Sequence, residues 1–142
     1  MSNPKKMTLI LSFFTISLFL IGLFYYWWVR EPTMVSELFG INHYEQKVIF
    51  RLDWFPSFVH QFSFVIFTWL VLDRRYLWFS VCFWFVLNIL FELGQAMPSE
   101  YIDYFPKIFA DYFSHGTYDH DDMLAIVVAT IIAYVVMIKY QK

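Results

Sequence analysis

Charged residues and cysteine are both scarce in this chain of 142 residues, and each shortage excludes a class of protein. Only 15% of the residues are charged, against roughly 25% in soluble proteins, and 60% are hydrophobic, which excludes a soluble domain. The single cysteine, Cys82, excludes a disulfide framework within the chain, and its apolar surroundings predict a small buried side chain. Because no basic run is interleaved with aromatic residues, no nucleic-acid partner is expected.

Apolar residues are abundant instead, and they form four runs that can cross, or nearly cross, a bilayer. A hydrocarbon core of about 30 Å requires roughly 20 residues of helix. We therefore predict an all-α integral membrane protein, a bundle of four transmembrane helices in a single membrane domain over residues 1–142. The predicted spans are about 8–28, 55–72, 76–93 and 121–138.

The first run has lysines before it, as a signal peptide has. It is long for a signal peptide, and no small-x-small cleavage site follows it. The run leads instead into the aromatic residues 25–28, which are typical of a membrane interface. We interpret it as a retained first span.

Basic residues predict the orientation of the bundle. Lysines or arginines occur before the first span, in the turn at 73–75 and after the last span, whereas the segment 94–122 holds only Lys107. The positive-inside rule then places both termini in the cytoplasm and residues 30–54 and 94–122 outside.

The second outer segment contains apolar residues at three- and four-residue spacing, which is typical of an amphipathic helix. Pro106 suits a helix start and Gly116 a helix end. We expect one short interfacial helix over about 101–113, between the third and fourth spans.

Three polar residues share one face of the third span. Asn88, Glu92 and Gln95 stand at i, i+4 and i+7, so they should point into the bundle, where Asn88 would help pack the helices. An acid at membrane depth is costly, which favours a functional role for Glu92. Its place near the outer end of the span also allows a simple contact with lipid headgroups.

The second and fourth spans begin with further candidates. Pro56 fits a first helical turn and puts His60 about one turn into the membrane, as a site residue or a hydrogen-bonded packing residue. Asp119 and Asp122 precede or open the last span, as site residues or as caps of its N-terminus. Small residues then follow on the face of Asp122, predicting close helix packing: Ala125, Ala129 and Ala133.

Known metal and nucleophile motifs are missing from the sequence. No His-Glu-x-x-His, EF-hand loop or Gly-x-Ser-x-Gly occurs, so neither a metal nor another cofactor is expected. Whether the chain is an enzyme stays open.

Two ordered motifs resemble those of the VanZ-like membrane proteins. Phe91–Gln95 reads Phe-Glu-Leu-Gly-Gln, and Gly116–Ala125 reads Gly-Thr-Tyr-Asp-x-x-Asp-Met-Leu-Ala; the start of the second span, Pro56–His60, is also similar. This chain has Ile126 where the family commonly has Asn followed by glycines. The resemblance implies a bacterial cytoplasmic (inner) membrane protein of about four spans, in a family whose founding member is associated with reduced teicoplanin susceptibility. It implies this polar set: His60, Glu92, Gln95, Asp119 and Asp122.

Three functions follow as hypotheses. The first is an outer-leaflet pocket that engages a membrane lipid or other amphiphilic molecule of the cell envelope and affects glycopeptide susceptibility. The second is a small structural or accessory subunit of a membrane complex, with a protein partner or a second copy of the chain; its many aromatic residues suit contacts. The third is an interfacial enzyme that uses a buried carboxylate.

Overall fold

The four long helices of this chain form over apolar runs that contain few charged residues. The computed structural model describes residues 4–29 and 52–141, and this part of the chain contains helices, turns and irregular segments but no strand. It confirms the all-α prediction for the described residues. The predicted outer segment 30–54 lies outside them except for residues 52–54. The helices are α1 (Pro4–Val29), α3 (Phe55–Val71), α4 (Leu77–Gln95), α5 (Ser99–Ile102), α6 (Lys107–His115) and α7 (His120–Tyr140).

Three of these helices are long and apolar enough to cross a membrane. They are α1, through its segment Lys6–Tyr25 of 20 residues, α4 with 19 residues and α7 with 21 residues. Their mean hydropathies are 2.3, 1.8 and 2.3. The fourth apolar helix, α3, has 17 residues and is therefore shorter than the other three.

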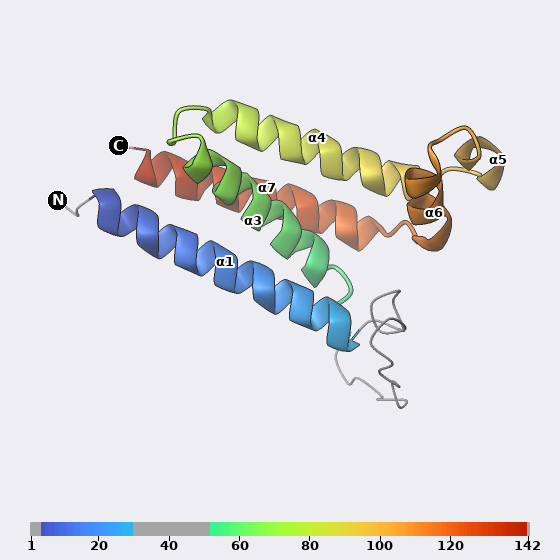
Figure 1. Cartoon of the computed structure of the whole chain (residues 1–142), viewed down its shortest axis with the longest axis horizontal. Coiled ribbons are helices and arrows are strands. Elements are labelled where there is room, and N and C mark those ends of the chain that lie inside the picture. Colours follow the sequence, from blue (N-terminus) through green and yellow to red (C-terminus); the bar gives the residue numbers. More distant parts are fainter. Residues whose placement is uncertain (1–3, 30–51, 142) are drawn as a thin grey trace.

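The central position in the bundle belongs to α3. It packs against α1, α4 and α7, and Figure 1 shows it between α1 on one side and α4 and α7 on the other. The four long helices alternate in direction. The start of α1, the turn between α3 and α4 and the end of α7 therefore lie at one end, whereas α5 and α6 lie at the other (Figure 1).

The buried core runs along the contact between α3 and α7. Val65, Ile66 and Trp69 of α3 are fully buried, and they join one cluster with Ala129 and Ala133 of α7. Alanines allow two helix backbones to approach closely in a bilayer. The small-residue face predicted from sequence thus lies in the core, where Ala125 is also buried.

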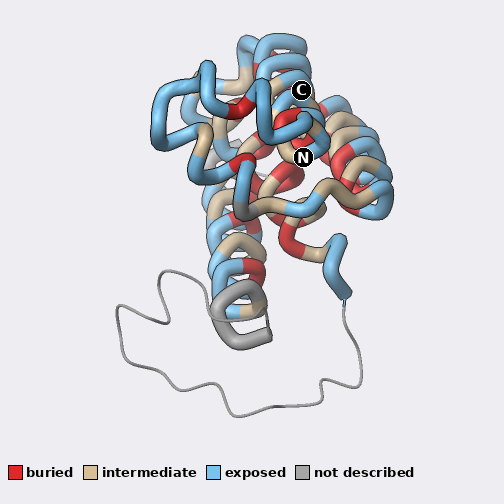
Figure 2. Tube along the Cα trace, turned by 90° about the vertical axis from the view of Figure 1, so that its right-hand side faces the viewer, coloured by how far each residue is buried: buried red, intermediate tan, exposed pale blue. Residues whose placement is uncertain are grey.

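The surface is apolar and several buried side chains are polar, the reverse of a soluble protein. Figure 2 shows buried positions toward the interior of the bundle and exposed ones around it. Phe13, Trp78 and Leu124 are among the large exposed hydrophobic residues. The prediction of a buried Cys82 is wrong: its side chain is exposed, because it shares the outward face of α4 with Trp78 and Phe79. Buried polar residues include Thr15, Gln61, Ser63 and Ser80.

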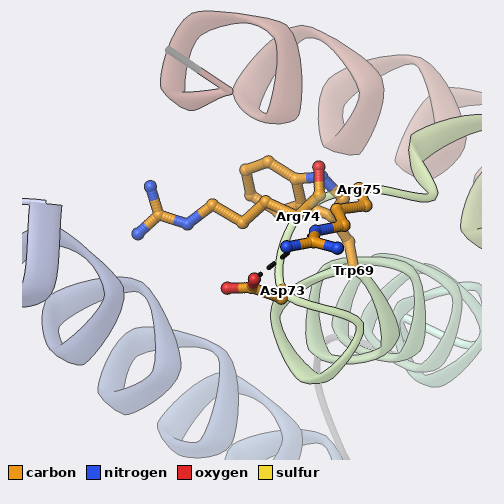
Figure 3. A network of polar contacts seen from close by, with 4 residues as sticks. All are labelled: Trp69, Asp73, Arg74 and Arg75. Atoms are coloured by element: carbon orange, nitrogen blue, oxygen red, sulfur yellow. Dashed lines mark hydrogen bonds and ion pairs between the residues drawn. The ribbon is translucent and has the colours of Figure 1, made fainter.

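Two non-glycine residues with left-handed backbone make the turn between α3 and α4. Asp73 and Arg74 have φ values of 54° and 62°. Arg74 donates from Nη1 to the carbonyl oxygen of Tyr140 at 3.2 Å and from Nη2 to Oγ1 of Thr8. The indole of Trp69 donates to the carbonyl oxygen of Arg74 at 3.1 Å, and its ring lies 5.8 Å from the guanidinium carbon (Figure 3). This turn therefore ties α3 to the beginning of α1 and the end of α7.

The structure of the segment between α4 and α7 differs from one prediction. Instead of a single helix over 101–113, the structure has two short helices, α5 and α6, separated at residues 103–106. Pro106 causes the break, because it lacks an N–H and disfavours helical backbone at Phe105. The helix start assigned to Pro106 agrees with the structure, since Pro106 is the N-cap of α6.

Close approach of α1 to α3 depends on Gly22. A Cβ atom at this position would lie 2.6 Å from Cγ1 of the fully buried Val59. We expect Gly22→Ala to lower the free energy of unfolding by about 1–3 kcal/mol through overpacking. Denaturant titration of the purified protein in mild detergent would measure this loss.

Two further variants test whether the contact with Val59 causes this loss of stability. Ile21→Ala removes an exposed side chain next to Gly22 and should change stability little. Combining Gly22→Ala with Val59→Ala should cost less than the sum of the two single losses, because the clash is relieved. Full additivity would contradict the proposed contact.

Candidate functional site

A groove between α3 and α4 is the best candidate site. Its volume is about 290 Å³, and it lies toward the end of the bundle where α3 and α4 diverge (Figure 1). Ile126 of α7 and Tyr112 of α6 also contribute to its lining. Polar groups and aromatic rings make up most of the remaining lining: Ser57, His60, Asn88 and Glu92, with Phe64, Trp84 and Phe91. We call this the outer groove, after the orientation that was predicted from the sequence.

Stacked rings form one wall of the outer groove. The imidazole of His60 stacks on Phe64 with centroids 5.8 Å apart, and Phe64 stacks on Trp84 at 4.5 Å. Trp84 is held in turn by a hydrogen bond from its Nε1 to Oγ1 of Thr68, 2.7 Å long. This series of contacts between α3 and α4 fixes the plane of the His60 ring.

A chain of hydrogen bonds links the helices next to the groove. Nδ2 of Asn88 donates to Oε1 of Gln61 at 2.6 Å, and Nε2 of Gln61 donates to Oγ1 of Thr130 at 2.7 Å. The Thr130 hydroxyl donates onward to the carbonyl oxygen of Ile126 at 2.7 Å. The Gln61 amide, which is fully buried, thus links α3 to both α4 and α7.

Two carboxyl groups are buried at this end of the bundle. Glu92 and Asp122 are each only 7% exposed, and one oxygen of each, Oε2 and Oδ1, is sealed from solvent. Glu92 lines the outer groove, whereas Asp122 does not. A buried carboxyl group is a strong hydrogen-bonding partner for any polar ligand that reaches it.

The two sequence motifs pack against each other. A Cβ atom at Gly116 would lie 2.4 Å from Cδ of Gln95, so the Gln95 side chain rests on the glycine that precedes α7. A Cβ atom at Gly94 would lie 2.4 Å from Cε1 of Phe113. These contacts hold α6 and the start of α7 against the end of α4.

The predicted site residues therefore separate into two groups. His60 and Glu92 line the outer groove, and Asn88 lines it while also joining α4 to α3. Asp119, Asp122 and Gln95 do not line it. Asp119 is the N-cap of α7, accepting a hydrogen bond from the backbone N–H of Asp121 at 2.9 Å.

Sequence reasoning missed Gln61, Thr130, Trp84 and Ser57. An amide within the apolar run 55–72 was a usable signal for Gln61, because the argument that turns Asn88 inward applies equally to it. Trp84 carried no such signal among the many aromatic residues of the spans.

In the described part of the chain, no group of three or more His, Cys, Asp or Glu side chains could hold a metal ion.

No family model, curated protein or solved structure matches this chain. The chemistry of the outer groove follows from its own side chains. Hydroxyl, imidazole, amide and carboxyl groups can bind a polar headgroup, and its rings offer apolar surface beside them.

The Gln61 bridge yields a measurable coupling. Gln61→Met preserves volume but removes both amide hydrogen bonds, so we expect a loss of about 1 kcal/mol in unfolding free energy. In a double-mutant cycle with Asn88→Leu, the second substitution should cost much less than it does alone. Ser63→Ala with Asn88→Leu is the control pair and should be additive, since Ser63 donates to the backbone carbonyl of Thr15 on α1, at 3.5 Å, and does not join the Gln61 bridge.

Proposed function

We propose that this chain is a four-span, VanZ-like protein of the bacterial inner membrane whose outer groove engages an amphiphilic molecule of the cell envelope. One observation carries this proposal. Buried or half-buried polar groups and aromatic rings line a groove between the apolar helices α3 and α4, and α4 has an exposed apolar face that is suited to lipid. A headgroup could enter such a groove sideways from the bilayer while its hydrocarbon chain stays in lipid.

Four spans fit the arrangement of the helices. The start of α1 and the end of α7 lie at one end of the bundle, which requires an even number of crossings (Figure 1). With 17 residues, α3 is about 26 Å long, against a hydrocarbon core of about 30 Å. Because three neighbours surround α3, a difference of this size is readily accommodated.

Charge favours an orientation with both termini in the cytoplasm. Lys6, Arg74, Arg75 and Lys139 belong to the end of the bundle that holds the termini. Acidic residues dominate the described segments at the other end: Glu100, Asp103, Asp111, Asp119 and Asp121. The positive-inside rule then directs the outer groove toward the outer leaflet.

The depth of the groove suits a headgroup. Asn88 lies seven residues before the end of α4 at Gln95, which corresponds to about 10 Å along the helix axis. A ligand that reached Asn88 would therefore place its polar atoms within the outer leaflet, below the interface. Glu92 lies one turn nearer the outer end, along the same path.

The resemblance to VanZ-like proteins supports the same proposal. Its two motifs are distant in sequence, yet the contacts of Gly94 and Gln95 with Phe113 and Gly116 bring them together beside the outer groove. Packing of this kind gives the motif glycines a steric role, because a side chain at either position would collide with its neighbour.

Labelling of single cysteines tests the topology. In a Cys82→Ser background, we expect Ser99→Cys to react with a membrane-impermeant maleimide on intact cells. Gln141→Cys should react only after the cells are permeabilised. The reverse pattern would overturn the orientation, and equal labelling of both in intact cells would overturn the four-span arrangement.

Binding is tested by Glu92→Gln. Loss of a hydrogen bond to the carboxyl group should weaken ligand binding roughly ten-fold or more. Mass spectrometry of the envelope lipids that copurify in mild detergent would measure this, together with glycopeptide susceptibility of cells lacking the native protein. Glu100→Gln is the matched control, since Glu100 is an exposed acid of α5 outside the groove.

Each result has a clear meaning. Wild type and Glu100→Gln should retain the same lipid and give the same susceptibility, whereas Glu92→Gln should lose the lipid and give the susceptibility of cells that lack the protein. If the wild type and both variants behave alike at equal expression, the outer groove is not the binding site.

A further inference from the structure

A second groove lies at the opposite end of the bundle, between the start of α4 and the end of α7. Its volume is about 440 Å³, and it shares no lining residue with the outer groove. Leu77, Phe79 and Ile138 supply apolar lining, and among the described lining residues Arg75 alone has a charged side chain. We call it the inner groove.

The adjacent arginines of the turn have different roles. Arg74 reaches across the bundle to α1 and α7, whereas Arg75 is 75% exposed and lines the inner groove. Figure 3 shows the two guanidinium groups pointing in different directions. Nε of Arg75 contacts Oδ2 of Asp73 at 3.6 Å, and both Nη groups remain available for other acceptors. Because this ion pair is exposed, it stabilises little and is easily exchanged.

Aromatic residues of the inner groove mark the level of the membrane interface. Trp78 and Tyr134 pack with their ring centroids 5.2 Å apart, and both line the groove together with Tyr76. Tyrosine and tryptophan are enriched where headgroups begin. Trp78 and Phe79 are also exposed on the surface that faces lipid, so the groove is continuous with the path of an acyl chain.

The charge of the inner groove indicates which kind of ligand it would bind. The described lining residues include one cation and no acid, which complements an anion, and arginine binds phosphate oxygens through several N–H groups at once. We propose that the inner groove binds the phosphodiester of an anionic phospholipid, with Arg75 on the phosphate and an acyl chain along Leu77, Phe79 and Ile138. This site does not depend on the function proposed for the outer groove.

Trp78 provides the readout. The full chain is reconstituted in nanodiscs that contain phosphatidylcholine and a minor fraction of phosphatidylglycerol, with brominated acyl chains on one lipid at a time. Brominated chains quench tryptophan fluorescence on contact. The part of this quenching that is lost in Trp78→Phe reports lipid at the inner groove. In the wild type we expect brominated phosphatidylglycerol to compete about five-fold better than phosphatidylcholine for this position, the preference typical of one basic residue near a membrane surface.

Three variants make the test specific. Arg75→Gln should abolish the preference, whereas Lys139→Gln should keep it, because Lys139 is a nearby cation that does not line the groove. Asp73→Asn should raise the preference, since it removes the competing acid while asparagine tolerates the left-handed backbone at φ 54°. Equal quenching by both lipids in the wild type would overturn the proposal. So would a preference that survives Arg75→Gln, or one that Lys139→Gln reduces equally.

Discussion

The structure depends on one constraint, that a buried amide in an apolar bundle must find its partners inside the protein. Gln61 satisfies it with Asn88 on one side and Thr130 on the other. These bonds fix how α4 and α7 are rotated about α3, because a small rotation of either helix would leave a polar group facing hydrocarbon. The outer groove borders this bridge, so its shape depends on the same constraint.

Much of the fold was accessible from sequence, because the signal is strong. Long apolar runs predict the helices, and the positions of α1, α3, α4 and α7 differ by only a few residues from the expected spans. The segment between α4 and α7 was harder to predict, because the helical spacing of its apolar residues continues across Pro106 while the helix itself is interrupted there. The exposure of Cys82 was misjudged for a related reason: an apolar run shows which residues are in the membrane region, but not which side faces lipid.

The candidate site was only partly accessible. His60 and Glu92 stood out as polar residues in apolar helices, and both line the outer groove. Asp119 stood out equally, yet its carboxylate accepts a bond from its own helix. Sequence position alone does not distinguish a side chain that faces a cavity from one that caps the backbone. Nor does it give distances between helices, so the pairing of Gln61 with Thr130 required the packed bundle.

The tight contact between Phe113 and Gly94 has a mechanical consequence. A methyl group at Gly94 would collide with this ring, so the ring lies directly on the backbone of α4. Tyr112, the neighbour of Phe113, lines the outer groove. A tilt of α6 about the Phe113 ring would therefore move Tyr112 and change the width of the groove, with the contact acting as a pivot. If the proposed function holds, that tilt would set the size of headgroup that the groove admits, without movement of the long helices.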